Sequence, residues 1–155
     1  MCIRDSYDAA YFIGTKYGDY TWEDLNANGI QDVGEPPLAN VIIDLFGINE
    51  LGDTTILQTQ SDSNGIYCFT DLIPGTYEVT FTPPTGYELT AGDQLNMDSL
   101  DSDMDANGMT IMEVLTSGES NVTYDAGFYQ PAAIGNYIWE DINGNGLQDL
   151  SLIHI

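Results

Sequence analysis

Tyr-Glu-Val-Thr-Phe-Thr, residues 77–82, carries the clearest secondary-structure pattern in the chain. Its apolar residues Tyr77, Val79 and Phe81 alternate with polar ones. This period of two is typical of a β-strand that buries one face and leaves the other in water. The stretch therefore predicts a sheet packed on one side against a hydrophobic core.

Six further stretches also predict strands. In residues 41–46 apolar side chains occupy most positions, so we expect that strand to be covered on most of both faces. Residues 66–70 follow Ser-Asn-Gly, a hairpin turn signal. Seven short strands with no convincing helix predict an all-β fold, a seven-stranded antiparallel β-sandwich. The full set is 17–22, 41–46, 55–60, 66–70, 77–82, 109–115 and 122–128.

The charge of the chain is strongly one-sided. In 155 residues, 25 Asp and Glu stand against 2 Lys and Arg, a formal net charge of −23. Such a chain repels phosphate backbones and acidic headgroups, so we expect no nucleic-acid partner and no membrane insertion in this fragment. A hydrophobic content of 43% argues against a disordered acidic tail. The partner that best suits so many carboxylates is a hard cation.

The two ends of the chain match adapter DNA. Residues 1–6 (MCIRDS) can be back-translated to ATG TGT ATA AGA GAC AG, and the reverse complement of that string encodes the start of residues 150–155 (LSLIHI). We therefore expect both segments to be adapter-derived artefacts. The remaining residues 7–149 keep one basic residue, Lys16, one cysteine, Cys68, and no histidine. This composition excludes an internal disulfide and disfavours histidine-based catalysis.

An internal repeat divides the rest of the chain. Residues 7–32 align without a gap on residues 124–149, with 13 of 26 positions identical at an offset of 117. A repeat of this length is domain-sized and indicates a tandem array, in which neighbouring repeats of the same chain are partners. The expected division is the end of a preceding repeat at 7–12, a complete repeat at 13–129, a linker at 130–133 and the start of the next repeat at 134–149.

One motif carries a specific chemistry. Residues 24–35 read DLNANGIQDVGE, which fits a twelve-residue calcium loop with glycine at its sixth position. Alternate residues of such a loop point oxygen atoms inward, and the twelfth can close the site with both carboxylate oxygens. The expected Ca²⁺ ligands are Asp24, Asn26, Asn28, Ile30, Asp32 and Glu35.

The start of the next repeat contains a truncated second copy of this loop. Its expected ligands are Asp141, Asn143, Asn145, Leu147 and Asp149. An EF-hand places helices on both sides of its loop, but here Tyr-Thr-Trp precedes the first copy and Pro36-Pro37 follows it. The loop must therefore bridge strands. The alternative is an Asx-rich turn that binds nothing.

A weaker acidic cluster lies in residues 98–108. Asp101, Asp103 and Asp105 alternate there, and their mutual repulsion suggests a countercharge, with a further ligand from a distant loop such as Asp71. The alternative is a solvated acidic turn. Residues 62–65, Asp-Ser-Asn-Gly, favour a hairpin turn over a site. Cys68 is expected to be a packed small hydrophobe on a strand and not a nucleophile.

Several motifs together resemble the B-type domain of serine–aspartate repeat surface proteins. They are IGNYIWEDINGNGLQD (134–149), GEPPLANVIIDLF (34–46), SDSNGIYCFTDLIPGTYEVTFTPPTGY (61–87) and TSGESNVTYDAGFYQPA (116–132). The resemblance implies a prealbumin-like or reversed immunoglobulin-like sandwich that binds calcium through the loop at 24–35. It also implies a stalk or spacer role in a secreted or cell-surface protein.

The related collagen-adhesin B-type domains often crosslink a Lys to an Asn or Asp with help from a strand Glu. In this chain Phe81 stands where that Glu would be, and Lys16 precedes the main strands. An internal isopeptide bond is therefore not expected.

The sequence thus predicts a non-enzymatic, calcium-stabilised module in an extracellular array of an adhesin-like protein. Two alternatives stay open. One is a ligand- or carbohydrate-binding adhesive module, in which an aromatic residue such as Tyr87 stacks on a sugar. The other is an accessory domain of a larger secreted enzyme. The host or surface ligand of such a module is unknown.

Overall fold

The chain folds into short β-strands that connect through long loops. A computed structural model describes residues 11–92, 100–135, 138, 140–141 and 144–147. None of these residues lies in a helix, and so none belongs to a helix that could cross a membrane. The strands are β1 (Thr15–Tyr17), β2 (Thr21–Glu23), β3 (Ile42–Asn49), β4 (Thr54–Gln60), β5 (Phe69–Leu72), β6 (Gly75–Thr82), β7 (Glu88–Leu89), β8 (Glu113–Leu115), β9 (Ser120–Asn121) and β10 (Ala126–Tyr129).

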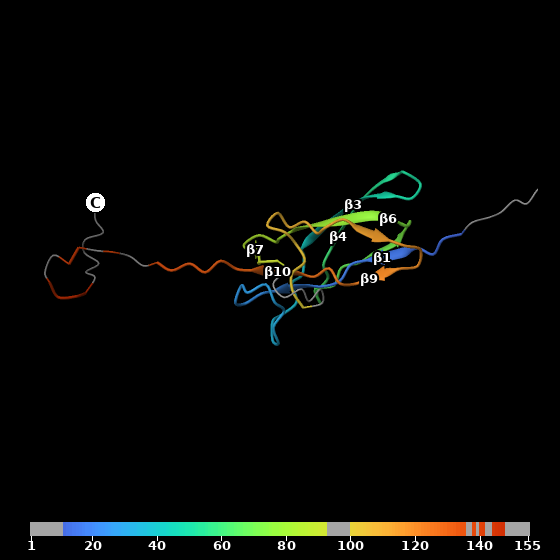
Figure 1. Cartoon of the computed structure of the whole chain (residues 1–155). Helices are drawn as coiled ribbons and strands as arrows, with labels where there is room; N and C mark the ends of the chain where they lie inside the picture. The colour runs from blue at the N-terminus through green and yellow to red at the C-terminus, as the bar shows by residue number, and fades with distance from the viewer. Residues whose placement is uncertain (1–10, 93–99, 136–137, 139, 142–143, 148–155) are drawn as a thin grey trace, which may run out of the picture.

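These strands form one larger sheet and two smaller ones (Figure 1). The larger sheet is antiparallel with the order β4-β3-β6-β8, and β3 pairs with β6 from Ile42↔Thr82 to Asn49↔Gly75. The smaller sheets have the orders β5-β1-β9 and β2-β10-β7. Two of their pairs, β1 with β9 and β2 with β10, are parallel.

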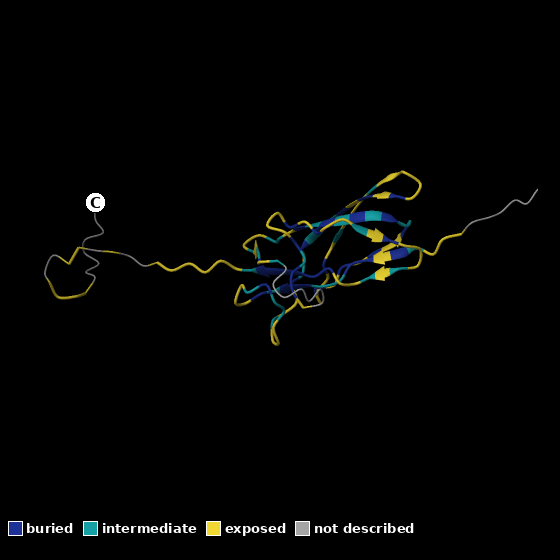
Figure 2. Cartoon of the chain, viewed as in Figure 1, coloured by how far each residue is buried: buried dark blue, intermediate teal, exposed yellow. Residues whose placement is uncertain are grey.

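The hydrophobic core lies between the larger sheet and the two smaller ones. Buried residues alternate with outward ones along β3 and β6, as the period of two requires, and the outward residues of β6 are all polar. Figure 2 shows buried residues in the strands of the larger sheet and of the smaller ones. This arrangement confirms the predicted all-β sandwich class. The largest fully buried side chains include Trp22, Tyr17, Tyr77, Phe81, Phe128, Ile43 and Leu45.

The stretch 17–22, expected to be one strand, is two strands in different sheets. The break falls at Gly18, where the chain passes directly over another segment. A Cβ on Gly18 would lie 2.4 Å from the carbonyl oxygen of Tyr67 and 2.7 Å from the Cα of Cys68. With no side chain, Gly18 allows this approach, and the chain changes sheet there.

Three other expectations also need correction. The described part of the chain holds ten strands, not seven, because 17–22 divides into two and because the short strands β7 and β9 leave no alternating pattern in the sequence. The strand at 41–46 buries one face only, since Phe46 is 40% exposed. Cys68 is exposed and precedes β5 instead of packing within a strand. By contrast, residues 62–65 do form the expected turn, in which Asp62 accepts hydrogen bonds from the amides of Asn64 and Ile66.

Candidate metal centre

The loop of residues 24–35 follows β2 and is held by backbone hydrogen bonds on two sides. At its start, the Asp24 amide donates to the Phe128 carbonyl of β10 at 2.7 Å. Farther along, Ile30 forms a bridge with Asp101, and the Ser102 amide donates to the Gly29 carbonyl at 3.0 Å. The loop therefore contacts two segments that lie far from it in the sequence, one around Asp101 and the other at Phe128.

Asp24 is the buried anchor of this loop. It is 1% exposed, and one of its oxygens accepts hydrogen bonds from the Gly29 amide at 2.8 Å and the Thr90 hydroxyl at 2.5 Å. Burial raises the pKa of Asp24, but the hydrogen bonds from Thr90 and from the loop amides outweigh burial and leave the pKa below its usual value. Asp24 is therefore a carboxylate anion at neutral pH.

The other polar side chains of the loop converge on Asp32. The side-chain amides of Asn26 and Asn28 each donate to Oδ2 of Asp32 at 2.9 Å. Glu35 folds back over the loop, with one oxygen 2.9 Å from the Leu25 amide and the other 2.9 Å from the Asp32 amide. The twelfth position thus closes the loop across its second and ninth positions.

The loop matches calcium in the chemistry of its donors. Its side chains offer carboxylate and amide oxygens, the ligand types that calcium takes, and three of them are acidic. Gly29 has φ +79°, the left-handed conformation that the sharp turn at the sixth position needs. Among the described residues, however, no three His, Cys, Asp or Glu side chains are gathered as a metal ion requires. The amides of Asn26 and Asn28 would have to turn their oxygens inward to coordinate a cation.

The second copy repeats the hydrogen bonds of the first. Asp141 accepts from the amides of Asn145 at 3.2 Å and Gly146 at 2.7 Å, as Asp24 accepts from Asn28 and Gly29. Asn145 accepts from the Leu147 amide at 2.7 Å. Asn143 and Asp149 lie outside the described residues. The repeated motif therefore forms the same hydrogen-bonded turn in a segment whose described residues are exposed.

The structure separates the three acids of the weaker cluster. Asp101 is buried against the 24–35 loop, opposite Ile30. Asp103 accepts a hydrogen bond from the Asp125 amide at 2.7 Å. Asp105 caps an exposed turn, and hydrogen bonds from Met109 and Asn107 lower its pKa. Although Asp101, Asp103 and Asp105 alternate in the sequence, each of them lies in a different environment in the fold.

The structure also contains a buried acid, Asp125, with two further acids near it, and the spacing of residues in the sequence does not indicate this group. Asp125 is 3% exposed, and burial, followed by the charges of Asp19 and Asp103, raises its pKa to about 8. Asp71, named as a distant ligand, lies on β5 beside Gly14 instead. A signal for Asp125 does exist in the repeat, because Asp8 occupies the matching position of the other copy.

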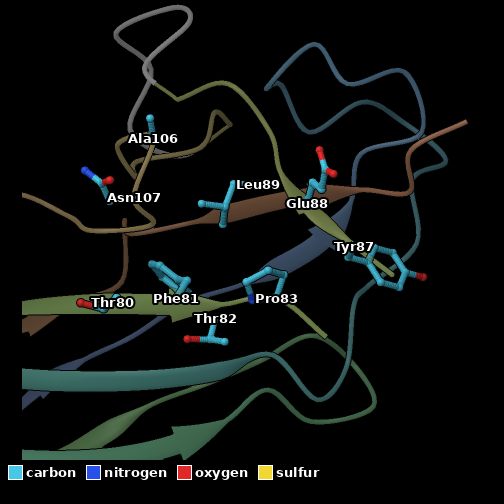
Figure 3. Close-up of a pocket in the computed structure, with 9 residues that line it drawn as sticks. All are labelled: Thr80, Phe81, Thr82, Pro83, Tyr87, Glu88, Leu89, Ala106 and Asn107. Atoms are coloured by element: carbon cyan, nitrogen blue, oxygen red, sulfur yellow. The ribbon is translucent and has the colours of Figure 1, made fainter. Parts of the chain in front are cut away.

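An open groove of ≈ 510 Å³ lies between the end of β6 and β7 (Figure 3). Phe81, at its floor, is buried in the core, so half-buried Tyr87 is the aromatic ring it offers to a ligand. The Glu88 carboxylate accepts a hydrogen bond from the Tyr129 hydroxyl at 2.9 Å. The lining residues are Thr80, Phe81, Thr82, Pro83, Tyr87, Glu88, Leu89, Ala106 and Asn107.

The chain is similar to one known domain family and to proteins whose names share the serine-aspartate repeat. Residues 15–128 match the SdrD B-like domain. The chain is 43% identical over 145 residues to serine-aspartate repeat-containing protein F of Staphylococcus epidermidis, covering 92% of this chain and 8% of that protein. It is 42% identical over 138 residues to serine-aspartate repeat-containing protein D of Staphylococcus aureus, covering 85% and 10% respectively. The chain thus spans at most a tenth of these relatives.

Two solved pilin structures are distantly similar. A minor pilin of Streptococcus agalactiae has a TM-score of 0.49 at 14% identity, covering 83% of this chain and 49% of the pilin. A shaft pilin of Lactobacillus rhamnosus has a TM-score of 0.45 at 13% identity, covering 79% and 52%.

Proposed function

The chain belongs to the SdrD B-like domain family, and from this premise we propose that it is a calcium-stabilised structural module. In this proposal the module is a spacer in a tandem array of a secreted or cell-surface, adhesin-like protein. It has no catalytic role. Its ion is Ca²⁺, and the sites are the loop at 24–35 and the partial copy that begins at Asp141.

The observation that carries the proposal is the position of the loop between distant segments. Asp24 contacts β10 through its amide and Thr90 through its carboxylate, while Gly29 accepts from Ser102. A cation bound to this loop would hold all of these segments together. Because such a cation binds the folded chain alone, its binding free energy would add to the free energy of unfolding.

The charge of the loop supports a divalent cation. Asp24, Asp32 and Glu35 place three carboxylates within twelve residues of a chain whose net charge is −23. Their mutual repulsion destabilises the folded state, and a bound Ca²⁺ would offset most of it. The loop would therefore hold its shape best when calcium is present.

The array and its location rest on the repeat and on the relatives. The alignment of residues 7–32 with 124–149 supports a chain of similar modules. The relatives are serine-aspartate repeat-containing proteins, of which the chain matches a small part. We infer an extracellular or cell-surface location, where millimolar calcium would fill sites with dissociation constants of about 10⁻⁴ to 10⁻³ M.

Thermal unfolding of the chain in millimolar calcium and in excess EDTA tests the proposal. At about 100 times its dissociation constant, calcium bound to one site would raise the free energy of unfolding by roughly 2.7 kcal/mol. For a chain of this size we expect the midpoint to rise by roughly 10 °C. Magnesium should not reproduce the effect, because its octahedral shell suits this loop poorly.

A matched pair of variants ties the effect to the loop. Glu35→Gln should remove most of the calcium-dependent rise, whereas Glu50→Gln, an exposed acid in the β3–β4 turn, should keep it. An equal midpoint in calcium and EDTA would contradict the proposal. The carbohydrate-binding alternative, centred on the groove beside Tyr87, would then be tested on a glycan array.

A further inference from the structure

Strand β4 is an unprotected edge of the larger sheet. It lies at the end of the order β4-β3-β6-β8 and pairs with β3 on one side (Figure 1). Its seven residues, Thr-Thr-Ile-Leu-Gln-Thr-Gln, include no charged residue and no proline. Long, uncharged edge strands are the ones on which another extended chain can pair.

The other edge strands that the structure describes are protected. They are only two to four residues long, and four of the five contain an Asp or Glu. Short length and charge are the usual devices that prevent pairing at an edge. The contrast singles out β4 in a chain where acids are common. The other edge strands are β2, β5, β7, β8 and β9.

The backbone of β4 presents a regular set of outward groups. At its two ends, the Ser61 amide donates to Val41 and the Asn49 amide donates to Asp53, both at 3.0 Å. Hydrogen-bonded and non-bonded pairs alternate in an antiparallel ladder, so residues 55, 57 and 59 must bond to β3. The N–H and C=O groups of residues 54, 56, 58 and 60 therefore point away from the sheet, and all four residues are exposed.

The surroundings of β4 combine apolar surface with negative charge. Ile56 is 72% exposed and lies opposite Phe46, which is 40% exposed on the outer face of β3. Asp44, opposite Gln58, and Glu78, opposite Phe46, add carboxylates to the same face. The one basic residue among those described, Lys16, lies on β1 in another sheet. A second copy, also at −23, would be repelled, whereas a basic segment would be attracted.

We propose that the β4 edge binds an extended basic peptide of a partner protein as an added strand. Main-chain hydrogen bonds to residues 54, 56, 58 and 60 supply the affinity. Apolar side chains of the peptide pack on Ile56 and Phe46, and its basic side chains lie near Asp44 and Glu78. This binding needs no groove and no rearrangement of the core.

Amide hydrogen exchange measured by NMR on the whole chain in calcium tests the proposal. The probe is a ten-residue synthetic peptide in which every second residue is threonine and the residues between are lysine and valine in turn, so that lysine and valine share one face of the added strand. Its control carries glutamate in place of lysine. With the lysine peptide at about 1 mM, we expect exchange to slow at Ile56 and Gln58 but not at Leu57, which already bonds to β3. The glutamate peptide should leave all of these amides unchanged.

A variant pair tests the main-chain contact directly. Ile56→Pro removes one outward N–H, while Ile56→Thr removes the same apolar side chain but keeps that N–H. We expect the proline variant to bind the lysine peptide about fivefold to tenfold more weakly than the threonine variant. Both variants are first checked by thermal unfolding, and if the proline variant does not fold, the alternating exchange pattern decides.

Three results would overturn the proposal. The first is the absence of alternating protection along β4 with the lysine peptide. The second is protection at the 24–35 loop instead, which would mean that lysine simply pairs with the loop carboxylates. The third is the same protection without peptide together with dimers in sedimentation equilibrium, which would identify a second copy of the chain as the occupant.

Discussion

The buried carboxyl of Asp125 predicts that the chain loses stability as the pH rises from weakly acidic to weakly basic. Burial first, and then the charges of Asp19 and Asp103, raise the pKa of Asp125 from 3.8 to about 8 in the folded chain. In the unfolded chain the same group ionises near its ordinary value. Between these two pKa values the folded state therefore holds a proton that the unfolded state has lost.

The sign and size of the effect follow from this difference. Stability falls with pH wherever the folded state binds more protons, so it should decrease up to about pH 8 and level off above it. From about pH 5 to about pH 8 the loss is on the order of 4 kcal/mol, at about 1.4 kcal/mol per pH unit. Asp19, whose pKa burial also raises, acts in the same direction. Asp24 acts only below its ordinary value, because its pKa is lowered.

Urea unfolding in metal-free buffer at a series of pH values measures this slope. Asp125→Asn should flatten it, because the amide does not titrate. Asp62→Asn is the matched control. Hydrogen bonds lower the pKa of Asp62, so this group titrates below the pH range of the experiment, and the decrease in stability with pH should persist in this variant. Equal stability at both ends of the window, or an unchanged slope in Asp125→Asn, would refute the reasoning.

Three further predictions concern the packing around the 24–35 loop, and each is measured by urea unfolding. Gly127→Ala should lower the free energy of unfolding by about 1–3 kcal/mol, because a Cβ there would lie 2.6 Å from Thr90 and 2.7 Å from the ring of Trp22. Gly135→Ala is the control, since no atom lies within 4 Å of its Cβ position, and it should leave the free energy of unfolding unchanged. Thr90→Val should cost about 1–3 kcal/mol and raise the pKa of Asp24, because the buried carboxylate loses a hydrogen bond. Gly29→Ala should cost about 1–2 kcal/mol, because alanine disfavours a φ of +79°.

A different result would contradict each of these three predictions. An unchanged unfolding curve for Gly127→Ala would mean that β2 and β10 can move apart without cost. A Thr90→Val variant as stable as the parent chain would mean that Asp24 finds another donor. For Gly29→Ala, the exposed Gly34, with φ +104° and no atom near its Cβ position, is the control that isolates backbone strain from packing.

The strands that could be predicted are those whose pairing is long and regular. Tyr77, Val79 and Phe81 alternate with polar residues because one face of β6 is buried against the core along its whole length. By contrast, nothing in residues 17–22 shows that the chain changes sheet at Gly18, because the cause is a contact with Tyr67, fifty residues away. The two-residue strand β9 is equally invisible, since two residues cannot show a period.

The candidate site divides in the same way. The loop at 24–35 is local, so its turn glycine and alternating oxygen-bearing side chains can be recognised from spacing. The surroundings of Asp24 are not local, because Thr90 and Phe128 come from other parts of the chain. The fold alone brings Asp19 near enough for its charge to raise the pKa of Asp125, and their separation in the sequence gives no sign of this interaction.

The parallel pairing of β2 with β10 has a mechanical consequence. β10 runs parallel to β2 in the register Ala126↔Thr21 to Phe128↔Glu23, and the chain enters and leaves the sandwich at opposite ends (Figure 1). Tension applied between the two ends would pull these neighbours in opposite directions along their length. Their hydrogen bonds would then be loaded together in shear and would not open one after another. The bond from Asp24 to Phe128 extends this ladder, so the 24–35 loop lies in the line of force.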